Sequence, residues 1–587
     1  MKKKGKWKVQ FLVMAFCVFG LVAVLVGSSY AIFSDVSDQG DYNTVTAGTL
    51  QLSYEDTQSL SLNNLYPVSD VEGMTGEGYT FTVRNIGTLP SDYKVMIQDD
   101  EAMIQADGCS DHLMPKANIK ISVDGGTPFL LSSIEESNYM ITTGNLQPGD
   151  SVTHVVKVWI DEASGNEILG THFHGKVVVE GIQGEFVYRD ESGANPPELV
   201  DGMIPVVYDE AQASWVKADT DGEWYNYQKQ KWANAVTVTE KNRDTYRNAE
   251  AGIVISMDDI NTMWVWIPRY EYMYTNLGDK YAGGTQAQPG EIKINFLSGT
   301  STTSSDETNY KIHPAFTFGE EELTGLWYAK FEVTGTVSTA CTDTNCDTSQ
   351  VTIKPGLAPL TNQSTSSFFY MARSMQTNNY GTYGFPNDAS YDIHMSKNSE
   401  WGAVAYLSQS KYGKYGNPNY EGVNKEVAIN NCNRIITGIG GDTVNASASS
   451  VTCIINTYET EKGQAASTTG NITGVYDMSG GANDYVMGNY NNIIGSSGFS
   501  SMPDSKYYDL YTSEDINIAC NGGICYGHAL SETAGWYVDE AFFVNSYYPW
   551  VYRGSNFSAD MYVGVFGFSY GSNVAFNVGS SRFIIAP

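Results

Sequence analysis

Basic residues are scarce in this 587-residue chain. It has 34 Lys and Arg against 66 Asp and Glu, a net charge of -32 at pH 7. Such an acidic surface repels phosphate backbones, so we expect no nucleic-acid partner. Histidine is also rare, with 7 residues, and none of them forms a triad in the C-terminal half.

Common catalytic motifs are missing too. No Gly-x-Ser-x-Gly elbow joins a strand pattern to a helix pattern, and the chain has neither a Cys–His signature nor a Walker-type phosphate loop. Charged residues make up only 17%, whereas Gly (58), Tyr (40) and aromatic residues (13%) are abundant. This composition predicts a mostly β, loop-rich secreted protein, and the length predicts two or three domains.

Residues 1–31 predict export. Lysines between Lys2 and Lys8 precede an apolar run from Phe11 to Val26, and small residues then lead to Ala31. This order is typical of a secretory signal. The apolar run is also close to the length that spans a bilayer, so a retained membrane anchor is the alternative. We therefore expect an extracellular or cell-surface location.

Six cysteines lie in close couples in the C-terminal half. Local couples in an exported protein indicate disulfides, whereas a zinc site would be expected to have histidines nearby. Cys109 is left over, either buried or available for intermolecular pairing. The predicted disulfides are Cys341–Cys346, Cys432–Cys453 and Cys520–Cys525.

Residues 32–188 alternate apolar and polar side chains in short runs separated by turns, which predicts an antiparallel β-sandwich. The segments Ala31–Asp35 and Thr46–Leu50 resemble motifs of the camelysin/TasA family of secreted matrix proteins. The resemblance implies cleavage near Ala31 and self-assembly of the mature sandwich into fibres by strand donation.

Residues 189–260 form a polar linker followed by a tryptophan-rich segment with Trp215, Trp224 and Trp232. We interpret this segment as short strands packed by aromatic rings against the C-terminal domain. A platform that stacks sugars is the alternative.

Residues 261–587 contain four elements that resemble, in order, those of the formylglycine-generating-enzyme (sulfatase-modifying-factor) family. They are Leu326–Thr334, Asn398–Leu407, Tyr476–Gly480 and Arg553–Ser555. The resemblance implies a C-type-lectin-like, α+β fold. The second element also predicts a helix by its own pattern, with Ser396 or Asn398 as the N-cap and one apolar side.

The resemblance does not extend to the family's chemistry. An enzyme of this family carries a copper-binding cysteine pair after the Arg553 element, and residues 557–564 contain no cysteine. Calcium often binds near the Met-Ser-Gly turn through an Asn, which Gly481 replaces here. Asn483 and Asp484 remain weak Ca²⁺ candidates. We therefore expect that the protein is not an enzyme and needs no cofactor. An extracellular oxidase of the sulfatase-modifying type is the alternative.

The C-terminal tract, residues 552–583, is rich in Tyr and Asn, which suit a binding surface. It resembles the variable region of lectin-fold proteins diversified by retroelements; an ordinary strand and loop is the alternative. Arg553, Gly554, Gly564, Val565, Phe566 and Arg582 would be its scaffold. The predicted ligand-binding residues are Tyr552, Asn556, Phe557, Asp560, Tyr562, Phe568, Tyr570, Asn573, Phe576 and Asn577.

These observations predict a non-enzymatic adhesion or ligand-binding protein, secreted or at the surface of a Gram-positive-type bacterium. Its partner would be an extracellular protein or glycan. A structural subunit of a biofilm-matrix fibre is the further alternative.

Overall fold

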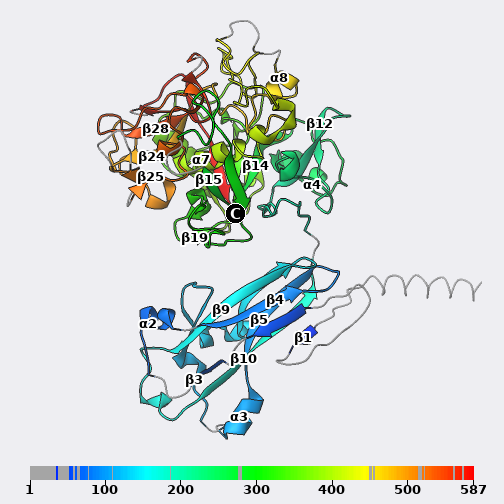
Figure 1. The fold of residues 1–587 in the computed structure, drawn as a ribbon, viewed down its shortest axis with the longest axis vertical. Helices are drawn as coiled ribbons and strands as arrows, with labels where there is room; N and C mark the ends of the chain where they lie inside the picture. The colour runs from blue at the N-terminus through cyan, green and yellow to red at the C-terminus, as the bar shows by residue number, and fades with distance from the viewer. Residues whose placement is uncertain are drawn as a thin grey trace, which may run out of the picture. The chain divides into compact units, whose positions relative to one another are not determined.

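The computed structural model describes residues 35–37, 52–56, 60–62, 66–76, 78–108, 110, 112–184, 187–274, 280–448, 453, 456–512, 519–520, 523–559, 562–571 and 574–587. Backbone contacts divide the chain into two compact units, Met1–Val187 and Tyr188–Pro587 (Figure 1). The predicted signal or anchor, residues 1–31, lies outside the described ranges. Within those ranges no helix is both long and apolar enough to cross a bilayer.

The protein is mostly β, as the composition predicts, and the helices in its described part are short. The longest of these, α5, has 13 residues. The helices are α2 (Asp70–Thr75), α3 (Glu101–Asp107), α4 (Glu240–Arg247), α5 (Thr365–Thr377), α6 (Tyr380–Tyr383), α7 (Asn398–Ser408) and α8 (Glu461–Gln464).

Two antiparallel sheets build the first unit. One has the order β1-β10-β5-β8 with β3 also paired to β10, and the other has the order β2-β4-β9-β6-β7. Buried side chains of both sheets, such as Phe81 in β4 and Val177 in β10, belong to one hydrophobic cluster. The strands are β1 (Asp35–Ser37), β2 (Leu52–Asp56), β3 (Leu60–Leu62), β4 (Tyr79–Asn85), β5 (Ser91–Asp99), β6 (Ile119–Val123), β7 (Phe129–Leu130), β8 (Met140–Leu146), β9 (Ser151–Ile160) and β10 (Phe173–Gln183).

A seven-stranded antiparallel sheet crosses the second unit in the order β12-β11-β13-β14-β20-β31-β23. It joins strands from the tryptophan-rich segment to a strand near residue 585. Trp215 and Trp232 of that segment are buried, and the Trp232 Nε1–H donates to the Tyr412 carbonyl at 2.8 Å. The strands are β11 (Ile204–Asp209), β12 (Ser214–Lys217), β13 (Asn234–Val238), β14 (Ile260–Pro268), β20 (Gly325–Ala329), β23 (Asp392–Met395) and β31 (Phe583–Ala586).

A second sheet of this unit has the order β27-β26-β25-β24-β28-β29, and β30 also pairs with β24. Its strands are β24 (Asn483–Tyr490), β25 (Asp509–Tyr511), β26 (Ala519–Cys520), β27 (Gly523–Ile524), β28 (Trp550–Arg553), β29 (Phe568–Gly571) and β30 (Gly579–Ser581). Short strands complete the unit: β15 (Tyr270–Tyr274), β16 (Ile292–Phe296), β17 (Lys311–Ile312), β18 (Thr317–Phe318), β19 (Glu321–Glu322), β21 (Thr334–Gly335) and β22 (Val351–Thr352).

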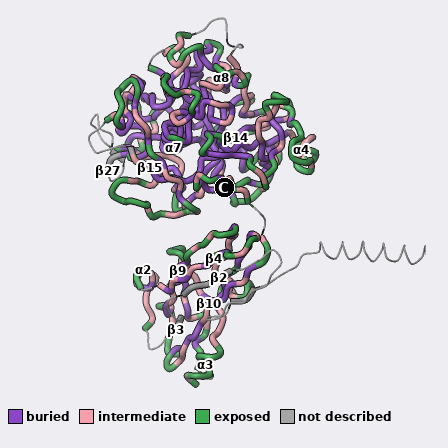
Figure 2. Tube along the Cα trace, turned by 45° about the vertical axis from the view of Figure 1, so that its right-hand side comes forward, coloured by how far each residue is buried: buried purple, intermediate pink, exposed green. Residues whose placement is uncertain are grey.

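Helix α7 confirms the predicted helix but not its predicted environment. All its residues are buried, rather than one side only (Figure 2). Gly402 allows the chain at Gly527 to pass so close that a Cβ would lie 2.0 Å from the Gly527 carbonyl oxygen. The prediction of Ser396 or Asn398 as the N-cap is also wrong. The N-cap is Lys397, whose backbone N–H donates to the Glu400 carboxylate at 2.7 Å.

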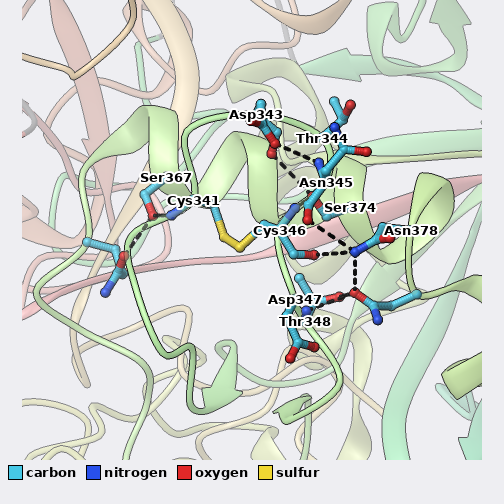
Figure 3. Close-up of a disulfide and its surroundings, with 12 residues drawn as sticks. Cys341, Asp343, Thr344, Asn345, Cys346, Asp347, Thr348, Ser367, Ser374 and Asn378 are labelled. Carbon is cyan, nitrogen blue, oxygen red and sulfur yellow. Dashed lines mark hydrogen bonds between the residues drawn. A yellow bond between two sulfur atoms is a disulfide. The ribbon is translucent and has the colours of Figure 1, made fainter.

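Two of the predicted disulfides are present, Cys341–Cys346 and Cys432–Cys453. The first lies against α5, where the backbone N–H of Cys341 donates to Ser367 Oγ and that of Cys346 to Ser374 Oγ (Figure 3). Cys525 is also disulfide-bonded. The side chain of Cys520, its predicted partner, lies outside the described part of the chain.

Candidate ligand-binding surface

The predicted binding tract is built on the edge of the second sheet. Strand β28 pairs antiparallel with β29, which places Tyr552 opposite Ser569 and Val551 opposite Tyr570. On the other side of β29, the Phe542 N–H donates to the Phe568 carbonyl at 3.0 Å, and the Phe568 N–H donates to the Glu540 carbonyl at 2.9 Å. These bonds hold the segment after Asp539 alongside the edge strand.

Two buried arginines, Arg553 in β28 and Arg582 directly after β30, pack in the core beside these strands. Arg553 lies 5.6 Å from the ring of Trp401 and donates from Nη1 to the Ala529 carbonyl at 3.0 Å. Arg582 lies 5.9 Å from the same ring. Burial lowers the pKa of Arg553 to about 10. Both arginines are therefore part of the core rather than of the binding surface.

The Tyr476–Gly480 motif is part of the same core. Asp477 Oδ1 accepts from Asn430 Nδ2 at 2.8 Å and from the Gly438 N–H at 2.9 Å. Burial raises the pKa of Asp477 to about 6. The Gly480 N–H donates to the Gly554 carbonyl at 3.1 Å, so the Tyr476–Gly480 and Arg553–Ser555 motifs contact each other directly.

The weak calcium candidates, Asn483 and Asp484, are both buried. Asp484 Oδ2 accepts from Arg582 Nε at 2.8 Å, and burial raises the pKa of Asp484. Within the described ranges, no group of three or more His, Cys, Asp or Glu residues is arranged to hold a metal ion. Asp484 thus forms an internal ion pair.

Above this core, aromatic side chains gather at the surface. Tyr548 and Tyr570 stack with their ring centroids 4.9 Å apart, and Phe542 lies 6.0 Å from Tyr570. Tyr547 is 85% exposed and Phe542 is 53% exposed. We call Phe542, Tyr547, Tyr548 and Tyr570 the Tyr570 surface.

A tight turn presents the two neighbouring tyrosines of this surface. The Asn545 side-chain oxygen accepts from the backbone N–H groups of Tyr547 and Tyr548, at 2.9 Å and 3.1 Å. The Asn545 N–H in turn donates to the Tyr548 carbonyl at 3.1 Å. The backbone is therefore fixed where the rings are most exposed, which lowers the entropy lost on binding.

The predicted binding residues do not form one surface. Tyr570 belongs to the Tyr570 surface, whereas the half-buried Tyr552 lies opposite Ser569 and therefore on the other side of the sheet. Phe568 is only 1% exposed and packs in the core, with its ring 5.5 Å from Arg553. Asn556 and Phe557 are half-buried, whereas Tyr562, Phe576 and Asn577 are exposed. Asp560 and Asn573 lie outside the described residues.

Sequence reasoning missed Phe542, Tyr547 and Tyr548. Their signal is the aromatic doublets Phe542-Phe543 and Tyr547-Tyr548, which directly precede β28. The doublets lie before the tract with the Tyr- and Asn-rich composition, and only the pairing of residues 540–542 with β29 brings them to it.

No protein-family model matches the chain, and no curated protein sequence matches it.

Proposed function

We propose that this is a secreted or cell-surface protein that binds an extracellular protein or glycan without catalysis. The observation that carries the proposal is the Tyr570 surface, where stacked and exposed aromatic rings stand on a rigid, buried framework. Tyrosine offers a large apolar face and a polar tip at low entropic cost, and aromatic residues dominate binding at interfaces.

The finer architecture belongs to the same proposal. Two sheets that share one hydrophobic cluster support a β-sandwich of the camelysin/TasA type in residues 32–188. The contact between the Gly480 and Gly554 segments around Trp401 supports a lectin-like domain of the formylglycine-generating-enzyme type. Such a domain would display the Tyr570 surface outside the cell.

Export is supported by the lysine-rich start with its apolar run and by the disulfides. The proposal also includes self-assembly through the N-terminal unit, which does not depend on ligand binding by the second unit.

Binding can be tested with the full chain on a glycan array and on immobilised mucin, collagen and fibronectin. We expect saturable binding to at least one of these probes, and the double variant Tyr547→Ser/Tyr548→Ser should weaken it at least tenfold. Tyr562→Ser/Phe576→Ser removes exposed rings outside the Tyr570 surface and is the matched control. Equal loss in both variants, or full binding by the first, would refute this site.

A further inference from the structure

A separate cavity of about 510 Å³ lies in the second unit. One wall comes from the chain between β15 and β16 and includes Gly290 and Glu291. The other comes from the chain after α7 and includes Tyr415 and Lys425, while Tyr537 also lines the cavity. Its volume falls within the usual range for small-molecule sites. None of its lining residues belongs to the Tyr570 surface.

One buried glutamine ties the walls of this cavity together. Gln409 Oε1 accepts from the Tyr537 hydroxyl at 3.0 Å, and Gln409 Nε2 donates to the carbonyls of Gly290 at 3.0 Å and Pro289 at 3.3 Å. Trp536 Nε1 also donates to the Lys280 carbonyl at 2.8 Å. The cavity is therefore preformed rather than a gap between mobile loops.

Its lining also includes strained backbone. Tyr537 has φ of 56° and the next residue, Val538, has φ of 74°, a region that β-branched residues strongly avoid. Hydrogen bonds hold this conformation: the Asp539 N–H donates to the Trp536 carbonyl at 2.9 Å, and the Asp539 carboxylate accepts from the Phe566 N–H at 3.1 Å. Strain that the surroundings enforce in this way is concentrated at ligand sites in proteins.

The charges of the lining favour an anion. Lys425 Nζ lies 4.0 Å over the ring of Tyr415 and donates to the carbonyl of that residue at 2.7 Å, which fixes the ammonium group. Lys293 is exposed, and among the residues that the structure describes its ammonium group has no hydrogen-bonding partner. Among the lining residues that the structure describes, Glu291 is the single acidic one, and its carboxylate already accepts from the Lys411 N–H at 3.2 Å.

We propose that this cavity binds a small organic anion, a ring-sized molecule carrying a carboxylate. The carboxylate would pair with Lys293 and Lys425, and the ring would pack against Tyr415 and Tyr537. The lining carries two cationic side chains and one acidic one in a chain of net charge -32, a local excess of positive charge that favours negative ligands.

The test uses three pyranoses of the same size with the full chain: glucuronate, glucose and glucosamine. Isothermal titration should give a dissociation constant for glucuronate at least tenfold lower than for glucose, with glucosamine weakest. Preferential binding of glucosamine, or equal affinity for all three sugars, would overturn the proposal.

Variants locate the site. Lys293→Gln and Lys425→Gln should each weaken glucuronate binding at least fivefold, whereas Lys241→Gln, an exposed lysine of α4, should leave it unchanged. Tyr547→Ser/Tyr548→Ser should also leave it unchanged, which separates this cavity from the Tyr570 surface. Unaltered binding by both cavity variants would place the anion elsewhere and contradict the inference.

Discussion

At the residue scale, several charged side chains lie inside the core of the second unit. The Arg582–Asp484 ion pair has side chains no more than 1% exposed. Burial opposes the charge of Arg582, but Asp484, Tyr328, Glu332 and Asp477 together raise its pKa. Removing the cation would leave these buried acids without compensation.

Arg582→Met should therefore lower the free energy of unfolding by about 3–5 kcal/mol, the usual cost of breaking a buried pair from one side. Arg247→Met is the matched control, because Arg247 forms a surface pair with Asp201 and such pairs contribute roughly 0–1 kcal/mol. Urea unfolding of both variants measures the difference. Similar costs would show that Arg582 is not the compensating charge.

Strain at Val538 can be measured by comparing two substitutions. Glycine adopts φ of 74° freely whereas alanine does not, so Val538→Gly should be more stable than Val538→Ala by about 1 kcal/mol after the larger entropy of the unfolded glycine chain is deducted. At Val207, within strand β11, the order should reverse. Thermal or urea unfolding gives both differences, and the same order at the two positions would argue against strain.

His394 should make stability depend on pH. Its ring lies 3.0 Å from both Asp392 Oδ1 and Glu400 Oε1, and although burial opposes it, the nearby Glu400 and Asp392 carboxylates raise the pKa of His394. This stabilisation is complete below the ordinary histidine pKa of 6.5 and is lost as pH rises through the raised value. The pKa values of Asp392 and Glu400 are lowered, so their contribution is lost only in acid.

The destabilisation caused by His394→Gln should consequently be larger at pH 6 than at pH 9 in urea unfolding. His313 gives the opposite control, because burial lowers its pKa. The cost of His313→Gln should grow as pH rises toward 6.5, where the unfolded histidine loses its proton. Parallel pH profiles for the two variants would contradict these assignments.

At the element scale, the disulfides restrain loops of different length. Cys341 and Cys346 are separated by 5 positions, and Cys432 and Cys453 by 21. Because loop-closure entropy grows with length, replacing the first pair by alanine should cost about 2 kcal/mol and replacing the second about 3 kcal/mol. Urea unfolding of the two double variants tests the order, which the reverse result would contradict.

The sequence predicts the elements better than their surroundings. The pattern around Trp401 indicates a helix, but its complete burial depends on distant segments at Gly527 and Val565, which no local pattern encodes. Likewise, the tyrosine content near Tyr570 indicates a binding surface, while Phe568 on the same strand is buried against Arg553. The rings of Phe542 and Tyr548 come from aromatic doublets before β28, and the sequence gives no sign that this segment lies beside β29.

At the scale of the whole molecule, the division at residues 187 and 188 predicts independent folding. Residues 188–587 expressed alone should keep the near-ultraviolet circular dichroism of this unit and unfold within about 3 °C of the corresponding transition of the full chain, since a shift of that size is roughly 1 kcal/mol in a large domain. A fragment without cooperative unfolding would show that the units depend on each other.

The position of β31 has a consequence for biosynthesis. This strand lies between β20 and β23 in the seven-stranded sheet, although β20 is made more than 250 residues earlier. While the ribosome is still producing the intervening chain, β20 exposes an unpaired apolar edge. The seven-stranded sheet can therefore be completed only after residue 586 has been translated.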